Sequence, residues 1–392
     1  MSALAAGALS SAATSVSNTL RFDDGEVQFR QRVVCSLLSR RPLLIRNIRN
    51  EDENPGLRDY EASFLRLIDS ITNGTTIEIN ETGTQLRLRP GVIVNGDVTH
   101  ECSNARSVAY YLEGLLPLAP FGKSDLRLTL TGVTDGLENE ECSVDFLAAS
   151  FVPLYRHFGV GVEADESSPP SLLVQRRGAA PLGGGSVTFY CPLAKSLRPV
   201  SLLDAGLIKK VRGAAVSCKI PPTSSARVAF AAKGVLHRLL PDVWIKTDSH
   251  SAAGKGGSGC GPSPGLKVVL TSESTTGVCL SAEQCIDPEA PRGSVMPEDL
   301  GVGVAAALLE EVKKGGCVDS ATQSFVFFMM CLCPDDVSRV KIGTLSKYAI
   351  VSLRLFKEVF GVEFKIKADT EEKTVTLSCL GTGFRNYSKR VT

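Results

Sequence analysis

The chain has 392 residues, 43% of them apolar, and its 43 basic and 42 acidic residues leave a formal net charge of +1. A chain of this size can bury a large core and suggests two or three domains. The balanced charge excludes a general nucleic-acid coat protein, so any RNA contact has to be a local patch. Of the twelve cysteines only Cys331 and Cys333 lie close together, and no two-pair spacing occurs, so the sequence predicts no metal site.

The first 19 residues are rich in Ala, Ser and Thr. They have neither a basic start nor an unbroken apolar centre, so they predict a mobile tail and not a secretory signal. No window of the sequence approaches the roughly 18 apolar residues that a membrane-spanning helix needs. We therefore expect no membrane partner.

One order of elements occurs three times: a helix with apolar periodicity, a break containing glycine, a strand, a polar turn and a second strand. The helices are expected at 62–72, 146–157 and 348–359. Alternation in 76–79 and 363–366 predicts half-buried strands. Each unit alone exposes an apolar sheet face, so the three should pack around a shared core. The predicted repeats span about 20–95, 96–195 and 286–392.

The stretch 196–285 differs in character and is predicted to be an inserted domain. It holds a helix-like run at 225–239, strand-like residues at 267–271 and a low-complexity segment at 251–265, expected to be a flexible loop. The predicted fold class is therefore α/β (α+β), with three related βαβ-type units around a shared core, interrupted by one smaller α/β insert domain.

Residues 177–187 read RGAAPLGGGSV and are the most specific local pattern. The triplet Gly183, Gly184 and Gly185 is costly to order, which indicates a backbone that approaches something closely. Arg177 beside it offers a planar array of donors suited to a phosphate or to a neighbouring carboxylate. A simple glycine-rich turn between strands is the alternative.

As a whole, this pattern resembles the signature of the RNA 3'-terminal phosphate cyclase family. Similar segments are PLLIRNIRNEDENPGL at 42–57, Leu115-Leu116-Pro117, Gly132-Val133-Thr134 and 144–147. The resemblance extends from about residue 22 to the C-terminus. It implies the same architecture, in which three related α/β units are interrupted by one smaller insert.

The family converts an RNA 3'-phosphate to a 2',3'-cyclic phosphate with ATP, through a histidine that becomes adenylylated. This chemistry needs a nitrogen nucleophile, because the intermediate is a phosphoramidate. Anchored on Ala321 and Gln323, the histidine position of the family is held here by Asp319. None of the four histidines, His100, His157, His237 and His250, falls within about sixty residues of it. Each has an ordinary structural interpretation; His157, for example, is expected at a helix end.

Two more positions depart from the family. Tyr60-Glu61 stands where the cyclases carry a glutamine-histidine pair, and Glu113 replaces a glutamine. Carboxylates at Glu61, Glu113 and Asp319 would repel a triphosphate, so we expect no nucleotide cofactor.

Three arginines retain the family's anion-binding character: Arg30, Arg49 and, beside the glycine triplet, Arg177. They could still bind phosphate. The alternative is that Arg30 and Arg49 pair with Glu61 or Glu113, since a buried arginine is normally matched by a carboxylate.

Asp335, Asp336, Arg339 and Lys341 form another candidate group. A carboxylate can activate a 2'-hydroxyl and a nearby cation can stabilise the developing phosphorane, as an endoribonuclease requires. The alternative is a helix start, with the two acids at the positive end of the helix dipole and Arg339 one turn later.

Residues 54–61 and 63–67 resemble most the catalytically degenerate, cyclase-like branch of the family in eukaryotes. That resemblance implies a non-catalytic nucleolar protein of the small-subunit processome, needed for the early pre-rRNA cleavages that release 18S rRNA for the 40S subunit. It also implies a stable partner, a large nucleolar GTPase of ribosome assembly, and a monomer within that larger complex. The alternatives are a pre-rRNA endoribonuclease and an active cyclase.

Overall fold

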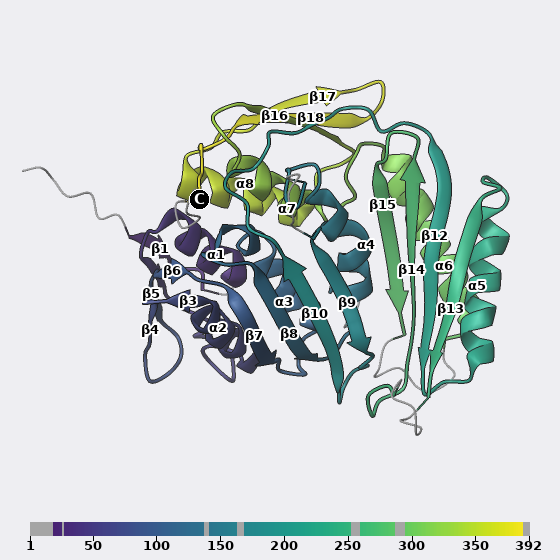
Figure 1. The fold of residues 1–392 in the computed structure, drawn as a ribbon, viewed down its shortest axis with the longest axis horizontal. Coiled ribbons are helices and arrows are strands. Elements are labelled where there is room, and N and C mark those ends of the chain that lie inside the picture. The colour runs from purple at the N-terminus through teal and green to yellow at the C-terminus, as the bar shows by residue number, and fades with distance from the viewer. Residues whose placement is uncertain are drawn as a thin grey trace, which may run out of the picture.

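The computed structural model describes residues 19–25, 27–136, 141–162, 168–251, 259–286 and 295–386. Residues 1–18 of the predicted tail and residues 252–258 of the predicted loop lie outside these ranges. Most of the strands belong to four four-stranded sheets. Three of these sheets surround a group of helices, which lies between them (Figure 1). No helix in the described ranges is long and apolar enough to span a membrane.

Three of the sheets share one topology. In each, two strands pair in parallel, with a helix directly before the second of them. A hairpin then adds two antiparallel strands, which gives the order first, second, fourth, third. This is the repeated unit that the sequence predicts. The fold class, three related units with a smaller insert, is therefore confirmed.

The first two repeats follow one another in the chain. The first contains β1 (Leu20–Phe22), α1 (Phe29–Ser39), β2 (Leu43–Ile45), α2 (Asp59–Ile71), β4 (Thr76–Ile79) and β5 (Leu86–Arg89), with a small pair of β3 (Thr72–Asn73) and β6 (Val92–Ile93). The second contains β7 (Gly96–Glu101), α3 (Val108–Leu115), the 3-10 helix η1 (Ala119–Phe121), β8 (Leu126–Gly132), α4 (Val144–Leu154), β9 (Ser171–Arg176) and β10 (Gly185–Cys191).

The third repeat is split by the insert. Its first strand, β11 (Ser201–Leu202), pairs with β16 across the whole insert. The other elements are α7 (Gln323–Cys331), β16 (Val337–Ile342), α8 (Lys347–Phe360), β17 (Lys365–Asp369) and β18 (Thr374–Leu380).

Between these parts lies the insert sheet, in the order β13-β12-β14-β15. Its elements are β12 (Ile208–Cys218), α5 (Pro222–Leu236), β13 (Val243–His250), β14 (Gly265–Ser274) and β15 (Cys279–Cys285). Helix α6 (Pro297–Lys314) packs on this sheet beside α5 and shares its core. The packing thus places β11 with the third repeat and α6 with the insert. The sequence, in contrast, suggested an insert that begins at residue 196 and ends at residue 285. The domain boundaries themselves remain a prediction.

Local sequence explains where several helices begin and end. Ser107, Ser143 and Ser346 precede α3, α4 and α8, and each serine hydroxyl accepts a hydrogen bond from a backbone N–H of the first turn. Such caps satisfy donors that a helix start leaves unpaired. Helix α8 ends at Gly361, whose φ of 69° is left-handed and suits glycine.

The second repeat corrects one expectation. The sequence suggested a strand directly after residues 158–160, but residues 161 and 162 form no strand, and 163–167 lie outside the described ranges. The hairpin of this repeat is formed by β9 and β10 instead. The glycine triplet therefore lies at the connection between the two hairpin strands.

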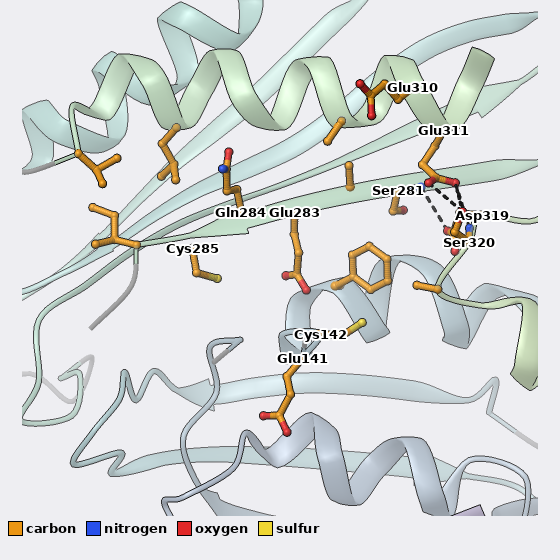
Figure 2. Close-up of a pocket in the computed structure, with 17 residues that line it drawn as sticks. Glu141, Cys142, Ser281, Glu283, Gln284, Cys285, Glu310, Glu311, Asp319 and Ser320 are labelled. Atoms are coloured by element: carbon orange, nitrogen blue, oxygen red, sulfur yellow. Dashed lines mark hydrogen bonds between the residues drawn. The ribbon is translucent and has the colours of Figure 1, made fainter. Parts of the chain in front are cut away.

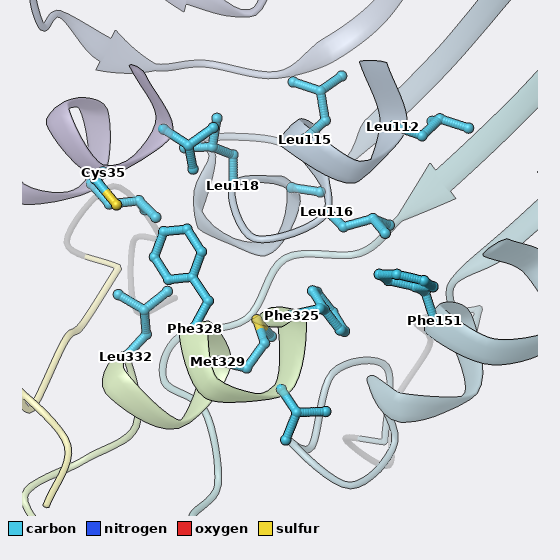
Figure 3. Close-up of a cluster of buried hydrophobic side chains, with 14 of the residues drawn as sticks. Cys35, Leu112, Leu115, Leu116, Leu118, Phe151, Phe325, Phe328, Met329 and Leu332 are labelled. Carbon is cyan, nitrogen blue, oxygen red and sulfur yellow. The ribbon is translucent and has the colours of Figure 1, made fainter. Parts of the chain in front are cut away.

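The three repeats share one apolar core, as predicted. Figure 3 shows its centre, where side chains of α1, α3, α4 and α7 meet; Phe325, Phe328 and Met329 of α7 are among them. Complete burial of such side chains contributes about 1.5–3 kcal/mol each. The insert has its own apolar cluster, built by its sheet with α5 and α6. Two cores thus meet along α4, β14 and β15, and polar side chains occupy that junction.

Candidate functional site

A cavity of about 830 Å³ opens at this junction (Figure 2). It is lined by β15, by one side of α6, by the start of α4 and by residues 319–321 before α7. None of the described lining residues is Lys, Arg or His, whereas five are carboxylates: Glu141, Glu283, Glu310, Glu311 and Asp319. We call this the acidic cavity.

Asp319, which holds the expected nucleophile position, lies in this lining and is 2% exposed. Its Oδ1 accepts hydrogen bonds from the backbone N–H and the hydroxyl of Thr322, at 2.9 and 2.7 Å. Its Oδ2 accepts one from the backbone N–H of Ser281, at 3.3 Å. The side chain therefore joins the start of α7 to β15. Burial raises the pKa of this carboxyl to about 6.

Two other carboxyls of the acidic cavity are also perturbed. Burial raises the pKa of Glu283 to about 7, although its Oε1 accepts a hydrogen bond from the backbone N–H of Ser143 at 2.7 Å. Burial likewise raises the pKa of Glu141, which pairs with Arg106 at 2.8 Å. A cluster of buried acids with raised pKa values favours cations or neutral donors over phosphates.

The histidines lie away from the acidic cavity: none of the four lines it. His100 contacts the hydroxyl of Ser63 at 2.9 Å, and burial lowers the pKa of both His100 and His157. His250 lies 3.0 Å from Asp248, and His237 ends α5. Within the described ranges, no group of three or more His, Cys, Asp or Glu residues could hold a metal ion.

Arg177 is part of a buried ion-pair cluster, next to the acidic cavity along the same junction. Lys267 of β14 is 1% exposed and lies 2.6 Å from both Asp135 and Asp145. Arg177 pairs with Asp145 and lies 3.7 Å from Asp248 of β13. Burial opposes ionisation of Asp145, but Lys267 and Arg177 hold its pKa well below the usual range. We call these five residues the ion-pair cluster.

The glycine triplet also lies at this junction, and the groups that approach its backbone closely belong to the protein itself. Gly183 and Gly184 have φ values of 60° and 76°. A Cβ on Gly184 would lie 3.1 Å from Pro262 of the insert, and one on Gly185 would lie 2.5 Å from Thr134. The sequence correctly indicates a tightly approached backbone. The structure shows which groups approach it, namely the end of β8 and the insert.

Arg49 and Glu61 form a bidentate ion pair, with N–O distances of 2.6 and 2.8 Å. Glu61 is 1% exposed, and its Oε2 also accepts a hydrogen bond from the backbone N–H of Arg58 at the start of α2. The carboxylate thus fastens the loop after β2 to α2. Of the two alternatives for Arg49, the structure contains the carboxylate pair.

Arg30 is held in a similar way. Its guanidinium lies 3.1 Å from Glu113 and stacks 3.9 Å from the ring centroid of Tyr110. Tyr60 packs edge-on against the same tyrosine, with 5.2 Å between ring centroids. The departures at Tyr60 and Glu113 therefore belong to one packed group with Arg30. Phosphate binding by Arg30, Arg49 and Arg177 remains a prediction, and each of them has a carboxylate partner.

The four nuclease candidates are not at a helix start, so that interpretation is wrong. Asp335 and Asp336 are exposed and precede strand β16, which carries Arg339 and Lys341 on one face. The carboxylate of Asp336 accepts a hydrogen bond from the backbone N–H of Val337 at 2.7 Å, and Lys341 pairs with Glu372. These side chains lie outside the acidic cavity.

Sequence reasoning missed the residues that dominate the junction: Lys267, Asp135, Glu283 and Glu141. Only Lys267 gives a local signal, because it is a single lysine in the apolar strand Gly265–Ser274. A buried lysine normally requires a carboxylate partner. The acids carry no such signal, since Glu283 fits an ordinary half-buried strand.

Comparison with known proteins agrees with this fold. A sequence model of the RNA 3'-terminal phosphate cyclase family matches residues 22–366. The RNA 3'-terminal phosphate cyclase-like protein of Mus musculus is 46% identical over 366 residues, which cover 92% of this chain and 95% of that protein. A probable RNA 3'-terminal phosphate cyclase-like protein of Dictyostelium discoideum is 43% identical over 379 residues, covering 93% of this chain and 98% of that protein.

A third relative carries a functional name. The rRNA processing protein rcl1 of Schizosaccharomyces pombe is 39% identical over 364 residues, which cover 92% of this chain and 95% of that protein. These matches span nearly all of the described structure, including the insert and all three repeats. The chain therefore belongs to the RNA 3'-terminal phosphate cyclase family.

Proposed function

We propose that this protein is a ribosome-assembly factor that acts in rRNA processing and does not carry out the cyclase reaction. The relative in Schizosaccharomyces pombe is named an rRNA processing protein, and others are named cyclase-like. The finer part of the proposal follows from the resemblance to the cyclase-like branch. It places the protein in the nucleolus, in the small-subunit processome, where early cleavages release 18S rRNA.

The observation that carries the proposal is the chemistry of Asp319 and its surroundings. A carboxylate attacking the α-phosphate of ATP gives a mixed anhydride and not a phosphoramidate, so it cannot substitute for the histidine. Asp319 is also buried and holds three hydrogen bonds within the fold. The other four carboxylates of the acidic cavity would repel a triphosphate that approached it.

The proposal includes a stable protein partner, the large GTPase of ribosome assembly. The net charge of +1 supports protein partnership over strong autonomous RNA binding, because phosphate contacts dominate nucleic-acid affinity. Pull-down of the full-length chain from nucleolar extract should recover a GTPase in stoichiometric amount. Recovery of free protein alone would remove the partner from the proposal.

Two experiments test the function itself. Depletion of the protein should lower 18S rRNA and accumulate its precursors, measured by hybridisation, while the large-subunit rRNAs stay near normal. Unchanged 18S rRNA would contradict the assembly role. Incubation of the purified protein with α-labelled ATP should leave it unlabelled, since none of the described residues that line the acidic cavity is a histidine or a lysine. A covalently labelled band would contradict the non-cyclase part.

The nuclease alternative has less support. Its candidates Asp335 and Asp336 are exposed, and Lys341 is paired with Glu372, so they do not enclose a phosphodiester. Purified wild-type and Asp336→Ala protein should therefore show the same absence of cleavage on a pre-rRNA fragment. Cleavage by the wild type that the variant loses would establish the alternative.

A further inference from the structure

The acidic cavity contains hydrogen-bond acceptors without donors. Two polar side-chain atoms in its lining, Oε2 of Glu283 and Oε1 of Gln284, are buried and have no hydrogen-bond partner within the described ranges. A buried acceptor without a donor costs about 1–3 kcal/mol. Both atoms are acceptors, so what they lack is a ligand that donates hydrogen bonds.

The two acceptors need two separate donor groups. Neighbouring residues of a strand point to opposite faces, and Figure 2 shows Gln284 directed toward α6 and Glu283 directed away from it. One small ion cannot satisfy both. A ligand with donors at two or more points along its length can do so from the open edge of β15, which is the last strand of the insert sheet.

The charge of the lining defines the ligand further. Within the described part of the chain, Glu283, Glu310 and Asp319 form no ion pair, whereas Glu141 pairs with Arg106 and Glu311 with Lys314. Uncompensated carboxylates in a partly enclosed space attract cations. The absence of a metal-ligating group among the described residues favours an organic cation over a metal ion.

Apolar side chains share this lining with the acids. Phe146, Leu300 and Ala307 contribute to the same lining. Such surfaces suit the methylene segments that separate the charges of an alkyl polyamine or of a lysine side chain. The volume of about 830 Å³ is within the usual range for small-ligand sites.

We propose that the acidic cavity binds a linear polycation whose protonated alkyl amines are neutralised by Glu283, Glu310 and the neighbouring carboxylates. The source of the amines is either a free polyamine or the lysine side chains of a protein segment. The binding is independent of the role in rRNA processing, because it depends only on the lining.

Calorimetric titration of the full-length protein with spermidine tests this proposal. We expect one site, release of protons at pH 7, and affinity that rises severalfold between pH 6 and pH 8. Burial raises the pKa of Glu283 to about 7, while the nearby charges of Lys267 and Asp145 act on it in opposite directions. The bound cation favours the ionised form of Glu283, so binding displaces its proton. Titrations in two buffers of different ionisation heat measure the proton release.

Variants locate the site. Glu283→Gln should weaken the binding of spermidine at least tenfold and abolish the release of protons. Glu310→Gln, at an exposed position, should weaken binding severalfold but keep the proton release. Glu358→Gln, an exposed position of α8 outside the lining, is the matched control and should bind like the wild type.

A second titration, with tetralysine, distinguishes a free polyamine from the lysine side chains of a protein segment. Tighter binding of tetralysine assigns the site to lysine side chains of a protein, and tighter binding of spermidine assigns it to a free polyamine. The proposal is overturned if neither ligand binds, or if Glu283→Gln and Glu310→Gln both bind like the wild type. The latter result would indicate only unspecific attraction to acidic surface.

Discussion

The ion-pair cluster and the acidic cavity lie along the same junction between the second repeat and the insert, yet they treat buried carboxylates in opposite ways. In the ion-pair cluster, Asp145 is matched by Lys267 and Arg177, and its pKa is held well below the usual range. In the acidic cavity, Glu283 forms no ion pair with any described residue, and burial outweighs the more distant Lys267 and raises its pKa to about 7. Burial acts in the same direction on both groups, so the nearby cation decides the outcome.

This difference distinguishes a cluster that holds the fold together from a cavity that has the capacity to bind a ligand. The ion-pair cluster is satisfied within the chain and joins Asp135 and Asp145 of the second repeat to Lys267 of the insert. In the acidic cavity, Oε2 of Glu283 and Oε1 of Gln284 have no hydrogen-bond partner among the described residues, and the cavity has volume to receive a ligand. The glycine triplet resembles an anion-binding signature, but the groups that approach it belong to the protein itself. In this respect it is like the ion-pair cluster and not like the acidic cavity.

The largest expected loss of stability comes from a substitution in the ion-pair cluster. Lys267→Met removes its central cation and leaves Asp135 buried without its partner. Breaking a buried ion pair from one side costs about 3–5 kcal/mol. We expect a loss of this size in the free energy of unfolding, measured by urea denaturation.

Lys209→Met is the matched control, since Lys209 is exposed in β12 of the same sheet. It should change the free energy of unfolding by less than about 0.5 kcal/mol. If Lys267→Met were as stable as this control, the ion-pair cluster would not join the two cores, and its contrast with the acidic cavity would disappear.

A smaller effect is expected where a matched pair lies away from the junction. Glu61→Gln leaves Arg49 without its bidentate partner and weakens the cap of α2. We expect a loss of roughly 2–3 kcal/mol in thermal or urea unfolding, because both the ion pair and the cap are affected. Glu51→Gln, exposed in the same loop, should be neutral. Equal stability of the two variants would show that the carboxylate at Glu61 is not structural.

The repeats could be predicted from the sequence because periodicity, glycine breaks and polar turns are local signals. Strand β11 could not, since it has two residues and its partner lies beyond the insert. The segment after Pro334 shows how two signals compete. Acids after a proline suggest a helix start, but 337–342 alternate between exposed and buried, and the strand pattern is the correct one.

The candidate site was predictable in part. The position of Asp319 could be found by resemblance, and Arg30 and Arg49 were correctly matched with carboxylates as one of two alternatives. The acidic cavity could not be found, because Glu283 and Glu141 are far apart in sequence and come together only when the insert packs on the second repeat. Unsatisfied acceptors are a property of that packing and leave no pattern in the chain.

The smallest expected effect is a pH dependence that belongs to the acidic cavity alone. The pKa of Glu283 is raised in the folded protein from an ordinary 4.5 to about 7. Its stabilising contribution is therefore complete below pH 4.5 and is lost as the pH rises toward 7. The free energy of unfolding of the wild type, relative to Glu283→Gln, should fall by about 2 kcal/mol between pH 5 and pH 7.

Urea denaturation of both proteins at several pH values measures this difference. Glu358→Gln should follow the wild type at every pH, because its carboxylate is exposed on α8. Parallel curves for the wild type and Glu283→Gln would mean that Glu283 is already compensated in the folded chain. In that case the acidic cavity would resemble the ion-pair cluster, and the reason to expect a cationic ligand there would be lost.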